Sequence, residues 1–257
     1  MTSQTRVVSL RHSALITALL ACTVLGSVRN SAAQGVGETR GFVTINSGYQ
    51  LTSTDFSDNV VFRLNVEEGD FDAGYRVDTG AVFDVSSGVR VSQNLAIGVG
   101  VSRFSRVDDA SVTARIPHPF FFDQHRPISA SAVGLQRQEI AVHAQALWIV
   151  PVNNRFDLAL FGGPTFVTVT QDLLTKVEFA ESYPFDTATF TGVTTRKQSA
   201  SGVGFNVGVD VAFYFSQHVG VGWLARFSRA TIDLALDTTV EVNAGGLHTG
   251  GGLRFRF

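Results

Sequence analysis

The chain has 257 residues, a formal net charge of -2 at pH 7, one Cys and only two Lys. The near-neutral charge excludes a strongly basic nucleic-acid-binding surface, and a single Cys excludes the disulfide framework of a small secreted domain. The 25 Gly and 21 Phe favour strands and closely spaced backbones over helices.

The N-terminal segment has the order of a secretory signal. Arg6 and Arg11 precede an apolar run over 14–28, and small residues up to Ala33 follow. We expect cleavage after Ala33. Two alternatives remain open: a retained membrane helix, which needs about 20 apolar residues, more than this run supplies, and lipid attachment at Cys22.

Alternating segments follow along the mature chain. In a β-strand successive side chains point to opposite faces, so strict alternation predicts a ribbon with two different faces. We predict eight strands, at about 41–54, 74–91, 95–114, 135–150, 155–173, 203–215, 219–227 and 247–257. The fifth has no clear faces, because Gly162, Gly163 and Pro164 interrupt its alternation.

Short and long connections alternate between the predicted strands. Short turns fall near 92–94, 151–154 and 216–218, and the first long connection includes the acidic stretch Glu67–Asp72. Transmembrane barrels have short periplasmic turns and long extracellular loops, so this phase places both termini in the periplasm. Because a lipid-crossing strand needs only about 9–11 residues, the longer segments should project beyond the membrane as hairpins.

The composition of the polar face distinguishes a membrane barrel from a soluble one. A soluble lipocalin-type barrel turns its apolar face inward and would show Lys and Glu outside. Here the polar face carries mostly Gly, Ala, Ser and Asn with scattered Asp and Arg, as in Gly204, Asn206, Gly208 and Asp210. Small residues and sparse opposite charges suit a narrow interior, which leaves the apolar face for lipid.

The last strand alternates from Leu247 to Phe257 and ends on an aromatic residue. It resembles the closing strand of bacterial outer-membrane β-barrels, in which the final aromatic is part of what the assembly machinery recognises. Residues 35–257 resemble the OmpA-type family of eight-stranded barrels. The resemblance implies an all-β, antiparallel, up-and-down transmembrane barrel in the Gram-negative outer membrane, surrounded by lipid and lipopolysaccharide, with no cofactor.

The cleavage expected after Ala33 sets the domain limits, with residues 1–33 as signal peptide and 34–257 as barrel. Larger members of the family attach a periplasmic peptidoglycan-binding domain after the barrel, whereas this chain ends at the predicted last strand. Cell-wall anchoring is therefore not implied, and the oligomeric state is left open.

Ionisable residues on the predicted inner faces form the candidate site. They carry both signs of charge: Asp84, Arg90, Glu139, His143, Asp210, Arg226, Arg254 and Arg256. Asp210 and Arg226 are about equally far from the 216–218 turn, so we expect them to be neighbours within salt-bridge reach. Eight strands enclose just enough space for side chains to fill. The favoured interpretation is a lumen plugged by ion pairs, and the alternative is a narrow gated pore for small solutes.

The loop after the third predicted strand carries three consecutive aromatics, Phe120, Phe121 and Phe122. Exposed, they would form a contact surface for a partner, an apolar ligand or lipopolysaccharide; folded back, they would pack on the barrel rim. His118 and His125 lie in the same loop with Asp123, but no nucleophile, base and orienting group come together. No catalytic, metal or cofactor site is expected. A structural, surface-interacting barrel is the favoured function, and a lipid-modifying enzyme at the rim is less favoured.

Overall fold

The computed structural model describes residues 40–235 and 239–257, so the predicted signal peptide lies outside the described residues. Ten antiparallel strands make up the described chain: β1 (Gly41–Gln50), β2 (Thr54–Leu64), β3 (Glu67–Val77), β4 (Gly80–Arg90), β5 (Leu95–Pro117), β6 (His125–Asn153), β7 (Phe156–Glu181), β8 (Ala188–Tyr214), β9 (Val219–Ala235) and β10 (Thr239–Arg256). Within these ranges no helix is long and apolar enough to cross a bilayer.

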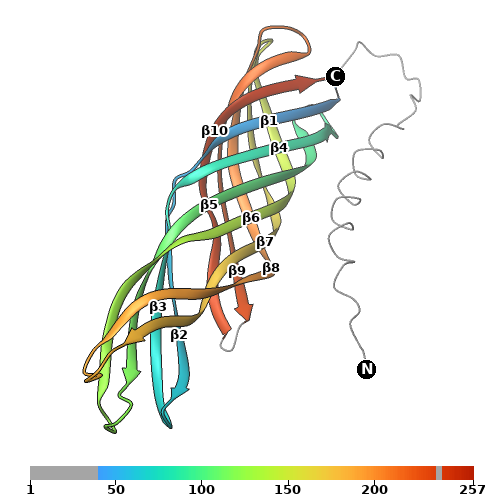
Figure 1. Ribbon diagram of the computed structural model, residues 1–257. Helices are drawn as coiled ribbons and strands as arrows, with labels where there is room; N and C mark the ends of the chain where they lie inside the picture. The colour runs from blue at the N-terminus through green and yellow to red at the C-terminus, as the bar shows by residue number, and fades with distance from the viewer. Residues whose placement is uncertain (1–39, 236–238) are drawn as a thin grey trace, which may run out of the picture. The chain divides into compact units, whose positions relative to one another are not determined.

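The strands close into a ring. Their order is β2-β3-β5-β4-β1-β10-β9-β8-β7-β6, and an additional pairing of β6 with β5 closes the ring, from which β3 and β2 branch at β5 (Figure 1). Only Leu51–Ser53 separate β1 from β2, and only Asp78 and Thr79 separate β3 from β4. The ten elements therefore form eight barrel strands, which confirms the predicted eight-stranded antiparallel barrel.

The first and last strands form the closing seam. The β1–β10 register runs from Phe42 opposite Arg256 to Gln50 opposite His248. Gly41 and Phe257 exchange two backbone hydrogen bonds, of 2.8 and 2.9 Å. Both ends of the folded chain thus lie at the same end of the barrel, together with the short turns after β4, β6 and β8. We call this end the base.

An apolar belt surrounds the barrel next to the base. Its members are exposed, large and apolar, and they come from each of the eight barrel strands: Tyr49, Phe83, Val85, Val89, Leu95, Ile97, Val99, Val101, Ile140, Val142, Trp148, Leu160, Phe166, Val203, Phe205, Val207, Phe213, Val221, Trp223, Phe227, Leu247 and Leu253. The strand with uncertain faces, β7, contributes Leu160 and Phe166, while its Phe161 is buried inside. An apolar surface that continues around a closed ring requires hydrocarbon outside it.

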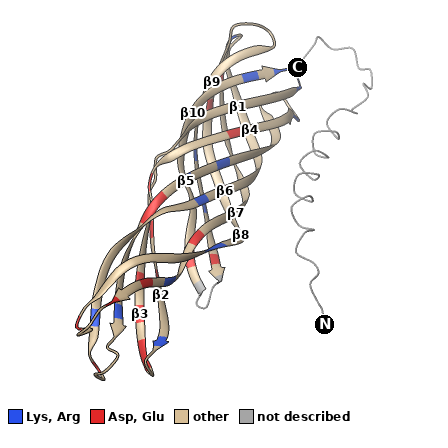
Figure 2. Ribbon diagram, in the orientation of Figure 1, with Lys and Arg blue, Asp and Glu red and all other residues tan. Residues whose placement is uncertain are grey.

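Beyond the belt the arrangement is reversed: apolar side chains face the interior and polar side chains face outward. We call this part the extension; it comprises β2, β3, the adjoining parts of β5 to β8 and the outer ends of β9 and β10. On β3 the buried residues are apolar, including Phe71, Ala73, Tyr75 and Val77, whereas Asp72 and Arg76 between them are exposed. Charged residues crowd the outer turns of this part (Figure 2). The extension therefore has an ordinary water-facing surface around an apolar core.

The core of the extension is one cluster contributed by opposing walls. Its buried members are Phe71, Ala73, Tyr75, Ala110, Val112, Ala114, Ile116, Ile128, Ala132, Leu135, Leu173, Leu174, Val177, Leu234, Val240 and Val242. These strands project from the membrane because they can bury this surface against each other.

Four predicted connections are largely strand. Residues 55–73 belong to β2 and β3 instead of an acidic loop, 125–134 begin β6, 174–181 and 188–202 belong to β7 and β8, and 228–235 and 239–246 belong to β9 and β10. The acidic stretch Glu67–Asp72 was predicted to be a loop because it is rich in carboxylates. In the structure these carboxylates face water on the outside of a strand. The prediction that the longer segments project as hairpins is confirmed.

In the belt every barrel strand pairs with both neighbours, although the β6–β7 register has a gap between Thr165 and Gly162, whereas several pairings end before the extension. The β8–β9 pairing stops at Gly204 opposite Ala230, and the β1–β10 pairing stops at Gln50 opposite His248. Among the described residues β2 pairs only with β3. Water can satisfy free strand edges in the extension, whereas hydrocarbon cannot, so closure is required only in the belt.

The belt makes a direct prediction about charge on β8. Val207→Arg, an exposed position within the belt, should lower the free energy of unfolding by about 2–4 kcal/mol, because the guanidinium must leave water for hydrocarbon. Thr195→Arg, an exposed position of the same strand in the extension, is the matched control and should have little effect. Equilibrium unfolding in lipid vesicles measures both; equal losses would contradict the position of the belt.

The apolar core of the extension makes a prediction about pH. Tyr75 is buried, its hydroxyl oxygen accepts the backbone N–H of Leu174 at 2.8 Å, and burial raises the pKa of Tyr75 from 10.0 to about 12. Because the folded pKa is raised, this contribution to stability is complete below pH 10 and is lost as pH rises through about 12. Absorbance titration at alkaline pH, compared with Tyr75→Phe, should show the missing tyrosine ionising last; ionisation near pH 10 would contradict its burial.

Candidate functional site

Charged and amide side chains fill the interior of the belt. Every residue of the sequence-predicted set lies on the lumen face. Asp84, Glu139, His143, Arg226 and Arg254 are buried, and Arg90, Asp210 and Arg256 are half-buried. The alternation of the strands brings them there, since each occupies the phase opposite to the lipid-facing residues.

The centre of the lumen is a continuous chain of ion pairs and hydrogen bonds. Arg226 donates to Asp84 at 2.5 Å, and Arg254 forms a bidentate ion pair with Asp210, with hydrogen bonds of 3.0 and 2.7 Å. Asn46 connects the two pairs: its oxygen accepts from Arg254 at 2.7 Å and its nitrogen donates to Asp84 at 3.2 Å. Side chains from β1, β4, β8, β9 and β10 are thereby linked across the barrel.

The expected pair between Asp210 and Arg226 is not formed. In the β8–β9 register Asp210 lies opposite Leu224, and Arg226 lies opposite Gly208. Each long arginine side chain instead crosses the narrow lumen to a carboxylate on another strand. Asp210 and Arg226 are therefore diagonal neighbours, as predicted, but the predicted salt bridge between them is wrong, because the interior of a barrel also brings in charged side chains from other strands.

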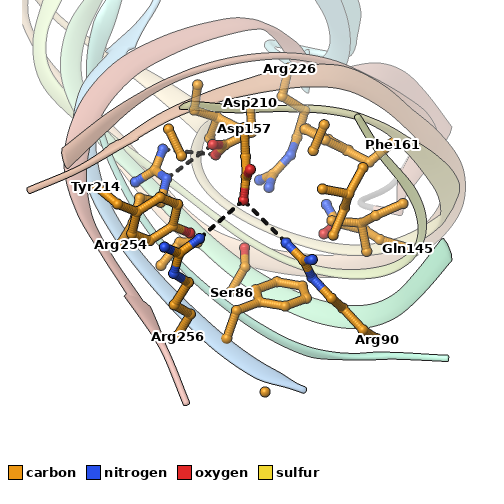
Figure 3. Close-up of a pocket in the computed structure, with 18 residues that line it drawn as sticks. Ser86, Arg90, Gln145, Asp157, Phe161, Asp210, Tyr214, Arg226, Arg254 and Arg256 are labelled. Carbon is orange, nitrogen blue, oxygen red and sulfur yellow. Dashed lines mark hydrogen bonds and ion pairs between the residues drawn. The ribbon is translucent and has the colours of Figure 1, made fainter. Parts of the chain in front are cut away.

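A second group of charges lies at the base. Asp157 accepts from Arg90 at 3.1 Å and is 3.6 Å from Arg256. The guanidinium of Arg256 lies 3.8 Å from the centre of the Tyr214 ring. Figure 3 shows Asp157 between the two arginines. This group borders a cavity of about 60 Å³ that continues inward to Arg226.

Neutral polar groups continue the filling away from the base. His143 contacts Ser102 at 2.9 Å through Nε2 and Thr165 at 2.8 Å through Nδ1. Asn206 donates to the same Thr165 hydroxyl at 2.9 Å. Because both ring nitrogens of the fully buried His143 have partners, the orientation of its imidazole is fixed.

The polar filling ends in one more ion pair below the apolar core. Arg137 donates to Glu139 at 2.7 Å and to the carbonyl oxygen of Asn243 at 3.0 Å, and Glu139 accepts the backbone N–H of Gly245 at 2.9 Å. Both charged side chains are buried. This pair ties β6 to β10 across the lumen at the level where the extension begins.

Several lumen residues were missed in the sequence. Arg137 has the same phase as Glu139 on its strand, and Asn46 has the phase opposite to the apolar Val43 and Ile45, so alternation alone could have identified both. Asp157 was missed because the faces of β7 were not assigned. The interrupted alternation corresponds to a gap in the β6–β7 register between Thr165 and Gly162.

The three loop aromatics are exposed at the tip of the extension. Phe120, Phe121 and Phe122 are 68%, 55% and 73% exposed. His118 Nδ1 accepts the backbone N–H groups of Phe120 and Phe121 at 3.1 and 3.2 Å. Phe120 also packs edge-on against Phe185 of the β7–β8 loop, with ring centres 5.5 Å apart. The loop is held in shape while its aromatic rings face outward.

The histidines of this loop have structural contacts. His118 holds the backbone of its own loop, and His125 contacts the carbonyl oxygen of Glu68 at 2.9 Å. Within the described ranges no group of three or more His, Cys, Asp or Glu side chains is placed to hold a metal ion. The expectation that the chain is not an enzyme stays a prediction.

The distribution of polarity decides the architecture. The ring of strands is closed, its exposed outer band is apolar, and the charges of the same segment face inward. A water-soluble barrel has the opposite arrangement. The chain is an outer-membrane-type β-barrel.

Solved structures with a similar fold are outer-membrane proteins of low sequence identity. OprG from Pseudomonas aeruginosa is 9% identical over 86% of this chain and 98% of its own, with a TM-score of 0.42. The protease OmpT from Escherichia coli is 10% identical over 88% and 99%, with a TM-score of 0.47. Ail from Yersinia pestis is 12% identical over 84% and 99%, with a TM-score of 0.36. No protein-family model matches the chain, and no curated protein matches it in sequence.

The central ion pair makes a prediction about stability. Arg226→Met should lower the free energy of unfolding by about 3–5 kcal/mol, because it leaves Asp84 buried without its charged partner. The double variant Arg226→Met with Asp84→Asn removes the stranded charge and should recover most of the loss. Denaturant unfolding in vesicles compares the three proteins. A loss below about 1 kcal/mol in the single variant would mean that water replaces the guanidinium.

Proposed function

We propose that the chain is a non-conducting barrel of the Gram-negative outer membrane, related to the OmpA-type family, that carries a rigid surface for contacts outside the cell. One observation carries the proposal: two different kinds of closure lie one after the other along the lumen. The first is the network that joins Arg226, Asp84, Asn46, Arg254 and Asp210. The second is the apolar core of the extension.

The two closures exclude solutes for different physical reasons. An ion moving past Arg226 and Asp84 would have to separate a buried charge pair, which leaves each partner unpaired in a poorly solvated interior. Beyond them, Leu173 and Leu174 are fully buried within the apolar core, where an ion would find no polar partner. A structural and surface-contact role fits this geometry better than a narrow pore.

The proposed orientation places the base in the periplasm and the extension outside the cell. The short turns and both described ends lie at the base, as expected for periplasmic turns. Large aromatics of the belt gather there, including Trp148 and Phe213, as at a membrane–water interface. Phe257, 65% exposed beside the closing seam, is available as the proposed signal for the barrel assembly machinery.

The proposed contact surface is the tip of the extension. Three connections are joined there: the Asp123 N–H donates to Glu67 at 2.6 Å, and Arg126 donates to Glu181 at 2.8 Å and to the Phe185 carbonyl oxygen at 3.1 Å. These contacts hold the outward-facing Phe120–Phe122 segment on a fixed frame. We propose lipopolysaccharide or an apolar group of a surface partner as its contact.

The closed lumen predicts electrical silence. Purified protein beginning at Gln34 should give no conductance steps in planar bilayers. Asp210→Ala and Arg226→Ala should also be silent, because each disturbs only the charged closure and leaves the apolar core in place.

Circular dichroism of the same samples should show the β signal of a folded barrel, so that silence is not caused by unfolded protein. Resolved steps in the unmodified protein, with a size that changes in either alanine variant, would establish the narrow pore instead.

A further inference from the structure

The cavity at the base is a vestibule with more positive than negative side chains. Four arginines line it: Arg90, Arg226, Arg254 and Arg256. The carboxylates paired with them number three, since Arg226 pairs with Asp84, Arg254 with Asp210, and both remaining arginines with Asp157. No other carboxylate of the described chain lies within ion-pair distance of Arg90 or Arg256. One positive charge is therefore in excess.

The excess charge is located at the mouth of the vestibule. Arg90 reaches Asp157 through one nitrogen at 3.1 Å, and Arg256 is farther from the same carboxylate, at 3.6 Å. Arg256 also donates through Nε to the carbonyl oxygen of Gln217 at 2.8 Å and lies against the Tyr214 ring. Each guanidinium has five N–H donors. Arg90 and Arg256 both line the cavity, and the hydrogen bonds of each use only some of its donors (Figure 3).

The inner end of the vestibule offers a second, independent indication. Arg226 is 2% exposed, lines the cavity and stands over the Phe161 ring at 5.4 Å. Its Nε has no hydrogen-bond partner within the described chain. A buried donor without a partner is costly, so an acceptor inside the cavity would stabilise it.

The remaining walls are largely apolar. They are formed by Phe42, Leu147, Ile149, Ala159, Phe161 and Leu224. The volume of about 60 Å³ corresponds to roughly four to six waters, which limits the occupant to a small molecule or to one end of a larger one. Apolar walls with a few converging donors are typical of a small-ligand site.

We propose that the vestibule binds a small organic oxyanion, a carboxylate or phosphate ester that carries an apolar group. The oxyanion takes the spare donors of Arg90 and Arg256, which suit planar carboxylate and phosphate oxygens. The apolar group lies against Phe42, Leu147 and Ile149, so that Nε of Arg226 is left to a water at the inner end of the vestibule. A cation is excluded by the surplus of arginine, and a neutral molecule leaves the excess charge without a counterion.

This binding does not require the barrel to conduct. The vestibule is closed at its inner end by the pair of Arg226 and Asp84, so it is a blind pocket. Ligand binding to the vestibule is measured by calorimetry, and closure of the lumen is measured by conductance. A failure of the proposed site is therefore distinguished from a failure of the proposed non-conducting role.

Isothermal titration of sodium benzoate into the mature chain, folded in maltoside micelles without phosphate, tests the site. Asp157→Asn removes the internal competitor for both arginines and should tighten benzoate binding by at least about threefold, or ~0.7 kcal/mol. The double variant Arg90→Gln with Arg256→Gln should weaken binding by at least about tenfold. Arg155→Gln, an exposed arginine in the neighbouring turn, is the matched control and should leave binding unchanged.

Two further arms identify the source of the oxyanion. Inorganic phosphate competing with benzoate indicates a free anion, and phosphatidylglycerol added to the micelles and competing with benzoate indicates a lipid headgroup. Benzyl alcohol, the uncharged analogue, should not bind.

The proposal is overturned if neither the unmodified protein nor Asp157→Asn binds benzoate. It is also overturned if benzyl alcohol binds as well as benzoate, or if Asp157→Asn weakens binding. The Asp157→Asn result keeps the test decisive even if the double arginine variant does not fold, because a general loss of structure cannot tighten binding.

Discussion

The need to pair every backbone amide and carbonyl in hydrocarbon determines this structure. A sheet in lipid cannot leave an open edge, so the first and last strands must meet, and β1 pairs with β10 along its whole length. Above the belt the same two strands separate, and β8 and β9 separate as well, because water can satisfy their edges. The closed and open parts of one wall thus correspond to its two solvents.

Closure with only eight strands makes the interior narrow, and narrowness explains the residues that fill it. Long arginines need space, which small residues on facing strands provide. A Cβ at Gly222 would lie 2.7 Å from Nε of Arg254, so glycine is required beside that side chain. The enclosed charges then pair across the lumen, as Arg226 does with Asp84. Gly-rich alternation and buried ion pairs are two consequences of one small radius.

Alternation predicted the belt well because lipid imposes a strict rule on one face. Val203–Tyr214 shows both faces directly in the sequence, and the structure places them accordingly. The same rule failed for β2, where Phe56, Val60 and Phe62 point inward, toward the core of the extension, while polar Asp58 shares their face and Val61 lies on the exposed one. There the polar members suggested a loop. The ion pairs within the lumen could not be predicted from the sequence, since Arg226 and Asp84 are 142 positions apart and meet only when the barrel closes.

The plugged centre and the vestibule follow from the same arrangement of charge. If each arginine of the lumen were paired with a separate carboxylate, ion pairs could fill the lumen as far as the base. Sharing of Asp157 between Arg90 and Arg256 prevents this, because two guanidiniums cannot both be neutralised by one carboxylate. The cavity that both arginines line extends inward to Phe161. The cavity therefore begins where two arginines share one carboxylate, and it ends inward at the balanced pair of Arg226 and Asp84.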